Sequence, residues 1–120
     1  MDAVTTHTRS DVTKLLAERQ QTTEKLEHLA RELRSMAEPS ADEADTDAYE
    51  REKILALVQS LQRKLESIDH ALEMAEKGTY GICEGCGDRI DPARLEILPQ
   101  ATLCLKCQRD FERRNKRSRR

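Results

Sequence analysis

The chain has very few aromatic side chains. Only Tyr49, Tyr80 and Phe111 carry an aromatic ring, whereas charged residues make up 37% of the 120 residues. A compact globular core depends on large apolar side chains, so this composition excludes a fold held together by such a core alone. The bias toward charged residues is typical of long helices and coiled coils. We therefore expect an extended fold, or one stabilised by an additional link such as a metal.

Long apolar runs are also absent. The longest covers residues 54–58, whereas a membrane-spanning helix needs about 20 apolar residues. The N-terminus has no basic stretch followed by an apolar one, so no secretory signal and no membrane contact are predicted. We expect a cytoplasmic protein. In that reducing compartment, four cysteines serve as metal ligands more often than as disulfides.

The sequence contains no pattern that predicts catalysis. No Ser–His–Asp or Cys–His arrangement is evident, and there is no Gly-rich phosphate-binding loop. His28 and His70 fall on outward heptad positions of the helices described below, and His7 lies close to the N-terminus. The sequence therefore predicts a protein that is not an enzyme.

The formal net charge of −2 hides two oppositely charged segments. Residues 38–52 contain seven acidic residues and one basic residue, Arg51. Residues 113–120 contain six basic residues and no acidic one. Runs of like charge are commonly solvated surface, but they also bind partners of opposite charge. Each segment is a separate candidate for an interaction surface.

A heptad pattern runs from Val12 to Met36 without Gly or Pro. Its core positions are Val12, Leu15, Arg19, Thr22, Leu26, Leu29, Leu33 and Met36. Because Arg19 and Thr22 are poor core residues, this seam should be weakest in its first third. We expect a helix over residues 9–37, which at 1.5 Å per residue is about 40 Å long.

A second stretch repeats the same apolar spacing. Its core positions are Ile54, Val58, Leu61, Leu65, Ile68, Leu72 and Ala75. Pro39 disfavours helix at the residue before it, and Gly78 is a suitable stop for the second helix. Two apolar stripes joined by a short turn predict an antiparallel coiled-coil hairpin, expected as a monomer. Leu16, Leu55 and Leu57 lie off the seam and would favour the alternative, self-association into a bundle.

The strongest chemical pattern is the pair of Cys-x2-Cys motifs formed by Cys83, Cys86, Cys104 and Cys107. Their spacing predicts one four-thiolate zinc site, and Gly85 and Gly87 allow the first turn to close. Four protein ligands leave no position open for substrate, so the zinc would be structural. Disulfides, a redox-active Cys-x2-Cys and an iron–sulfur cluster are alternatives that the context favours less.

These features predict a mainly α fold with three parts. Residues 1–79 form a long antiparallel coiled-coil hairpin with an acidic tip near 38–47. Residues 80–112 form a small four-cysteine zinc finger with the start of a C-terminal helix, and 113–120 form a basic tail. About 30 residues with one aliphatic cluster cannot fold well without a metal, so the zinc is expected to hold the finger together.

The region around the cysteines resembles the DksA/TraR family of zinc-finger, RNA polymerase-binding transcription regulators. The motif that carries the resemblance is Tyr80-Gly81-x-Cys83-x2-Cys86-Gly87-x2-Ile90-x3-Arg94-Leu95-x3-Pro99-x-Ala101-x2-Cys104-x2-Cys107-Gln108. Cysteine spacing and the other positions agree together over about 30 residues, which makes the match highly specific. The hairpin before the motif and the helix after it agree in layout.

The resemblance implies a regulator that binds RNA polymerase rather than DNA. In such proteins the zinc end rests on the polymerase rim, and the coiled coil enters the secondary channel toward the catalytic magnesium. Acidic residues at the tip alter the stability of open complexes, often together with ppGpp at the shared interface. Asp42 and Asp45 match the two aspartates of the family's Asp-x2-Asp-x-Ala tip, whereas Asp47 stands where alanine is expected.

Two other functions remain open from the sequence. The basic C-terminal tail could neutralise phosphates and make the chain a nucleic-acid-binding zinc protein, although no aromatic stacking platform accompanies it. The hairpin could instead pair with another coiled coil as a structural adaptor. Loss of residues 113–120 would abolish the first activity, whereas an adaptor would depend on the heptad seam.

Overall fold

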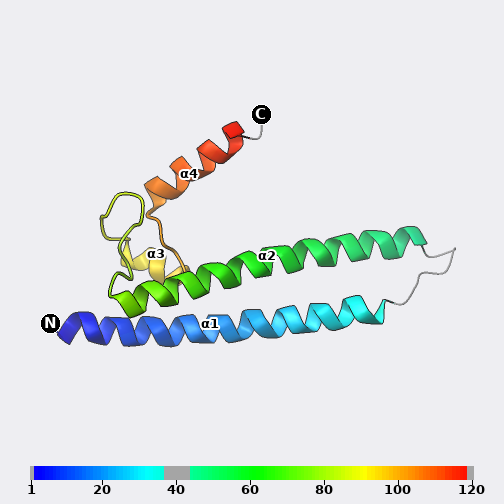
Figure 1. The fold of residues 1–120 in the computed structure, drawn as a ribbon, viewed down its shortest axis with the longest axis horizontal. Coiled ribbons are helices and arrows are strands. Elements are labelled where there is room, and N and C mark those ends of the chain that lie inside the picture. The colour runs from blue at the N-terminus through cyan, green and yellow to red at the C-terminus, as the bar shows by residue number, and fades with distance from the viewer. Residues whose placement is uncertain (1, 37–43, 119–120) are drawn as a thin grey trace. The chain divides into compact units, whose positions relative to one another are not determined.

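The computed structural model describes residues 2–36 and 44–118. Within them the chain forms helices α1 (Asp2–Ser35), α2 (Ala44–Lys77), α3 (Pro92–Ile97) and α4 (Leu105–Ser118) (Figure 1). The described residues contain no named strand, and one isolated bridge joins Ile82 to Arg89. The prediction of a mainly α fold is therefore confirmed. None of the helices among these residues has the length and apolar character that crossing a membrane requires.

The first helix starts earlier than the sequence pattern predicted. It begins at Asp2 instead of residue 9 and ends at Ser35, two residues before the expected end at 37. Residues 2–8 contain neither Gly nor Pro, so nothing in their sequence stops the helix from extending toward the N-terminus. The segment 37–43, which includes Asp42 of the expected acidic tip, lies outside the described residues.

Gly78 ends the second helix as expected. Its φ of 81° lies in the left-handed region, which a residue without a Cβ adopts at little cost. The Gly78 N–H donates to Ala75 O at 3.2 Å, and the Thr79 N–H donates to Met74 O at 2.9 Å. This pair of bonds is a Schellman motif, which satisfies two carbonyls at the helix end and turns the chain away from the helix axis.

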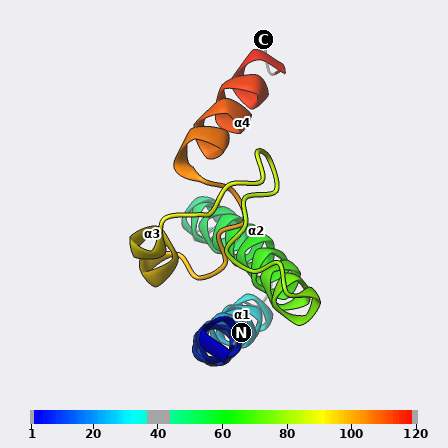
Figure 2. The same cartoon turned by 90° about the vertical axis from the view of Figure 1, so that its left-hand side faces the viewer.

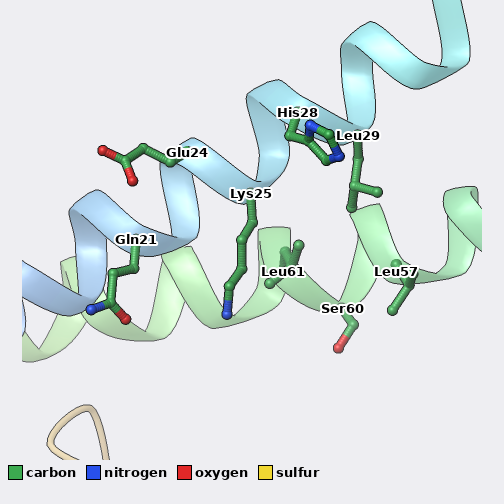
Figure 3. Close-up of a pocket in the computed structure, with 8 residues that line it drawn as sticks. All are labelled: Gln21, Glu24, Lys25, His28, Leu29, Leu57, Ser60 and Leu61. Atoms are coloured by element: carbon green, nitrogen blue, oxygen red, sulfur yellow. The ribbon is translucent and has the colours of Figure 1, made fainter.

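Helices α1 and α2 both run through two compact units, of which the first comprises residues 16–66. Inside this unit the two helices lie side by side, and Glu18 and Lys64 form an ion pair at 3.1 Å. Figure 3 shows Leu29 of α1 directed toward α2 between Leu57 and Leu61. Residue numbers fall along α2 as they rise along α1, so the helices are antiparallel, as the two stripes predicted.

The polar residues in the first heptad seam have different environments. Thr22 is 2% exposed, and its hydroxyl donates to Glu18 O at 2.8 Å, so burial leaves no donor unsatisfied. Arg19 is exposed, although the heptad pattern gives it a core position. Ile54 is 6% exposed and is the most buried apolar residue of α2 in this unit. Few side chains of the heptad seam are therefore buried in this unit, and one of them is the polar Thr22.

The second compact unit comprises residues 1–15 and 67–120. Its core is formed by Leu15 of α1 with Ile68 and Ala71 of α2, each at most 1% exposed. Leu72 and Tyr80 pack against this cluster. Figure 2 shows α3 to one side of α2, with its flanking loops running past the C-terminal part of that helix. The unit thus joins the base of the helix pair to the segment that carries the cysteines.

We predict that Leu15→Ala lowers the free energy of unfolding by about 2–5 kcal/mol, because it removes a fully buried side chain and leaves a cavity. Leu16→Ala is the matched control. Its side chain is 52% exposed, so the loss should stay within about 0.5 kcal/mol. Urea unfolding followed by circular dichroism measures both variants. Equal losses for the two variants would contradict the observed helix register.

Candidate metal centre

The first pair of cysteines lies on a tight turn between Gly81 and Ile90. The Cys83 N–H donates to Asp88 O at 2.8 Å, and the Ile90 N–H donates to Gly81 O at 2.8 Å. A further bond from Gly87 N–H to Cys83 O at 2.9 Å closes the turn. These backbone bonds hold the thiols of Cys83 and Cys86 on the same side of the loop, ready to contact one ion.

The two glycines in this turn have different roles. Gly87 has a φ of 81°, a conformation that residues with a Cβ rarely adopt. At Gly85, an added Cβ would lie 2.9 Å from the sulfur of Cys107, which is too close for any real contact. Gly85 therefore lets the second pair of cysteines approach the first. The prediction that glycine allows the turn to close is therefore confirmed at Gly87, whereas Gly85 is needed for the approach of Cys107.

The second pair of cysteines lies at the start of α4, with Cys104 just before the helix and Cys107 in its first turn. The intervening chain carries α3, whose N-cap Asp91 accepts from Ala93 N–H at 3.0 Å. The Glu84 N–H donates to Thr102 O at 2.9 Å, and this bond links the loops that bear the two pairs. The short helix thus brings Cys104 back to Cys83.

The four sulfurs form one cluster. All lie within 4.8 Å of one another, and the sulfurs of Cys86 and Cys104 are 3.9 Å apart. Four sulfurs at about 2.3 Å from a tetrahedral zinc ion would be separated by about 3.8 Å. Cys83 is buried, whereas Cys86 is exposed, so the site lies at the surface with one side covered. The cluster can therefore hold zinc after a small contraction.

Backbone N–H groups prepare the cluster for negative charge. Gly85 N–H and Cys104 N–H each donate to the sulfur of Cys83 at 3.3 Å, and Cys107 N–H donates to the sulfur of Cys104 at 3.5 Å. Burial raises the pKa of the Cys83 thiol, but N–H groups of Cys104, Cys86 and Gly85 outweigh it and lower that pKa to about 6. A thiolate at Cys83 is thus stabilised by the fold itself.

The Cys107 thiol resists ionisation because other cysteine side chains crowd it. The side chains of Cys104 and Cys83 raise the pKa of Cys107 to about 12. A group of adjacent thiolates needs a cation to compensate its charge, and a bound metal removes the protons from coordinating thiols. The donor set is soft sulfur, which suits zinc better than calcium or magnesium. The residues present therefore fit a zinc ion.

Two side-chain contacts join the finger to α2, and neither was predicted from the sequence. Tyr80, which packs on the core cluster, donates its hydroxyl to Pro99 O at 2.8 Å. His70 Nε2 lies 2.5 Å from Glu84 Oε1, in the loop between the first two cysteines. An outward heptad position gave His70 no visible partner, because its partner is 14 residues away along the chain. Tyr80 was visible as one of three aromatic residues, but its partner was not.

The predicted zinc ligands lie among the described residues, whereas the predicted tip side chains do not. It brings Cys83, Cys86, Cys104 and Cys107 together at one point. Asp42 lies outside the described residues, and Asp45 belongs to the first turn of α2, with its side chain likewise outside them. The geometry of the proposed acidic tip thus remains a prediction, whereas the clustering of the cysteines is observed.

An antiparallel pair of helices with a four-sulfur cluster at its base defines a helical-hairpin protein with a C4 zinc finger. Residues 78–113 match the family model described as the prokaryotic dksA/traR C4-type zinc finger. The chain is 39% identical over 105 residues to the RNA polymerase-binding transcription factor DksA of Caulobacter vibrioides, covering 86% of this chain and 74% of that protein. The chain therefore belongs to the DksA/TraR family.

Two further similarities agree with this assignment. The structure of transcription factor DksA2 from Pseudomonas aeruginosa has a TM-score of 0.78 and 32% sequence identity, covering 94% of this chain and 86% of that one. An uncharacterized protein of Aquifex aeolicus is 53% identical over 49 residues. Those residues are 41% of this chain and 34% of the Aquifex protein, so the chain spans about a third of that relative. The family match and the cysteine cluster together show one structural zinc ion.

We predict that Gly85→Ala weakens zinc binding by about 10–100-fold, the range typical of changes beside a metal ligand. The new Cβ would contact the sulfur of Cys107 and push it out of the cluster. Zinc affinity is measured by competition with a chromogenic chelator. Gly78→Ala is the control, because no atom lies within 4 Å of its added Cβ. Like any residue with a Cβ, alanine is strained at the φ of 81° found there. It should destabilise the end of α2 without weakening zinc binding, and equal affinity of the two variants would contradict this account.

Proposed function

We propose that this chain is a transcription regulator that binds RNA polymerase and inserts its hairpin tip into the secondary channel. The observation that carries the proposal is the 39% identity to Caulobacter DksA over 105 residues, because it extends beyond the zinc finger. The zinc-bearing end would rest on the polymerase surface. The regulator itself would catalyse no reaction, and it would act in the cytoplasm as a monomer.

The geometry of the helix pair supports this proposal. Between residues 16 and 35 alone, α1 covers about 30 Å at 1.5 Å per residue, with α2 alongside it. A paired helix of this length can carry side chains deep into a narrow channel, whereas a single helix with so weak an apolar stripe would not stay folded. Of the seven acidic residues of 38–52, three lie in the segment between the helices and four lie at the start of α2. Their carboxylates suit a site that contains magnesium.

We further propose that Cys83, Cys86, Cys104 and Cys107 are the four ligands of the zinc ion. In this role they connect α4 to the loop that follows α2, and the metal replaces the large apolar core that the segment lacks. The boundaries that we assign are 1–79 for the hairpin, 80–112 for the finger and 113–120 for the tail.

We expect Cys83→Ser to reduce the bound zinc from one ion per chain to a small fraction of that value. Its thiolate accepts two backbone hydrogen bonds that prepare the site, and a serine hydroxyl is a poor ligand for zinc. Metal analysis of the purified chain gives the stoichiometry. Glu84→Gln, at the adjacent position, should retain the full zinc content. Full zinc in both variants would show that Cys83 is not a ligand.

The acidic tip is tested with Asp42→Ala/Asp45→Ala. We expect the wild-type chain to change the lifetime of promoter open complexes, and the double variant to bind polymerase without changing it. The matched control is Glu66→Ala/Glu76→Ala, which removes two exposed acidic residues of α2 near its other end. Filter binding after addition of a competitor measures the lifetime, and displacement of labelled wild-type chain measures polymerase binding.

Three outcomes would change the proposal. If the wild-type chain neither binds polymerase nor alters the lifetime, the proposed function is wrong. If the double variant acts like the wild type, Asp42 and Asp45 do not act in the channel. If Glu66→Ala/Glu76→Ala has the same effect as the tip variant, the loss reflects net charge. Repeating the assay with ppGpp tests the expectation, implied by the family resemblance, that this nucleotide acts at the shared interface.

The adaptor alternative has its own test. An open groove of about 570 Å³ lies along the helix pair, with Leu57 51% exposed on its wall (Figure 3). Leu16 and Leu55 are also exposed, at 52% and 42%. Light scattering should give the mass of one chain if the protein is a monomer. A concentration-dependent mass that Leu57→Gln abolishes would instead support pairing through this groove.

A further inference from the structure

Helix α4 is the last helix along the chain (Figure 1). It carries a row of five exposed basic side chains. The row consists of Lys106, Arg109, Arg113, Lys116 and Arg117, and we call it the basic stripe. From Lys106 to Lys116 the members are separated by three or four residues, and Arg117 follows Arg113 by four, which is the spacing that places side chains on one face of a helix. The stripe is about 17 Å long at 1.5 Å per residue.

The rest of α4 does not neutralise the stripe. Of the two acidic residues of the helix, Asp110 pairs with Arg113 at 3.4 Å, and Glu112 accepts from Gln108 at 3.1 Å. The Arg113 side chain remains 70% exposed despite its ion pair. An exposed pair of this kind contributes little binding energy and leaves the guanidinium accessible to another anion. Asp110 and Glu112 also lie three or four residues from other members of the stripe, but two negative charges against five leave this face of α4 with a net positive charge.

We propose that the basic stripe of α4 binds the phosphodiester backbone of double-stranded nucleic acid without sequence preference. This inference goes beyond the proposed action on RNA polymerase. It also departs from the expectation, implied by the family resemblance, that the chain binds RNA polymerase rather than DNA. The helix places three charges of the C-terminal basic run on the same face as Lys106 and Arg109, which lie before that run.

The composition of the stripe favours nucleic acid over an acidic protein surface. Protein interfaces obtain most of their binding energy from buried apolar and aromatic anchors at their centre. The stripe contains none, and Phe111 falls on the opposite side of the helix by its spacing. Backbone binding to a duplex needs only positive charges, because released counterions supply the free energy. A duplex presents one phosphate per about 1.7 Å of its axis, so the stripe can meet several phosphates at once.

A membrane surface fits the stripe less well. A helix that lies in a membrane interface buries one continuous apolar face, flanked by basic residues. In α4 the two large apolar residues, Leu105 and Phe111, are separated by six positions and point in different directions around the helix. They cannot be buried together while the stripe contacts lipid headgroups. The charge row without an apolar face is therefore better matched to phosphodiesters.

The test uses the zinc-loaded full chain and a fluorescein-labelled DNA duplex of 20 or so base pairs with arbitrary sequence. Fluorescence anisotropy gives the affinity as a function of NaCl concentration. With five phosphates neutralised, the logarithm of the association constant should fall against the logarithm of the salt concentration with a slope of about −4.5. An RNA duplex of the same sequence shows which nucleic acid is preferred, and binding of either duplex supports the proposal.

The variant Arg113→Gln/Lys116→Gln/Arg117→Gln removes three charges at positions away from the cysteines. We expect the steepness of the salt dependence to drop by about 2.7. A charge-matched control, Arg31→Gln/Arg34→Gln/Arg63→Gln, removes three exposed basic residues from α1 and α2 and should leave the slope unchanged. Arg113→Lys/Arg117→Lys keeps the charge and should also retain the slope. Zinc content and helical circular dichroism establish that each variant is folded.

Several results would overturn the proposal. The first is no binding of either duplex at low salt. The second is an equal loss of slope in the stripe variant and its charge-matched control, because binding would then follow net charge. The third is a stripe variant that binds the duplex normally but loses affinity for RNA polymerase, which would make the stripe a protein-docking surface. None of the duplex measurements contains polymerase, so their failure is distinguishable from failure of the proposed function.

Discussion

Four thiolates can lie close together only when a cation compensates their charge, and the zinc finger of this protein depends on that constraint. The loop after α2 and the start of α4 have few apolar side chains to hold them together. Cys83 is prepared as a thiolate by backbone N–H groups, whereas the crowded Cys107 thiol is not. In the proposed site one zinc ion would bind all four sulfurs and compensate their charge, so metal binding and folding of the finger would be coupled.

The zinc finger and the helix pair are connected through a small core. Leu15, Ile68 and Ala71 exclude water at the base of the helices, and Tyr80 extends that core to Pro99 near α3. A contact between His70 and Glu84 adds a polar link on the outside. These contacts are few, which agrees with the low aromatic content of the chain. The fold therefore uses a metal and a minimal core where larger domains use many apolar contacts.

Charge is distributed unevenly along the chain. Seven acidic residues lie in and beside the segment that joins α1 to α2, and the basic stripe lies on α4. The formal net charge of −2 describes neither region. In the proposed function, the acidic residues act near a metal ion in polymerase. The basic stripe is free to contact a different polyanion, so one small regulator can engage two kinds of partner.

The sequence by itself determined the helix pair, the stop at Gly78 and the four cysteines. Each depends on local spacing or on the chemistry of a single residue type. Only the tertiary structure decided that Gly85 allows Cys107 to approach, and that Tyr80 and His70 join α2 to the finger. These contacts join residues far apart in the chain, and their partners are backbone atoms or ordinary polar side chains that leave no pattern in a single sequence. The start of α1 was misjudged because residues 2–8 carry no signal that begins or ends a helix.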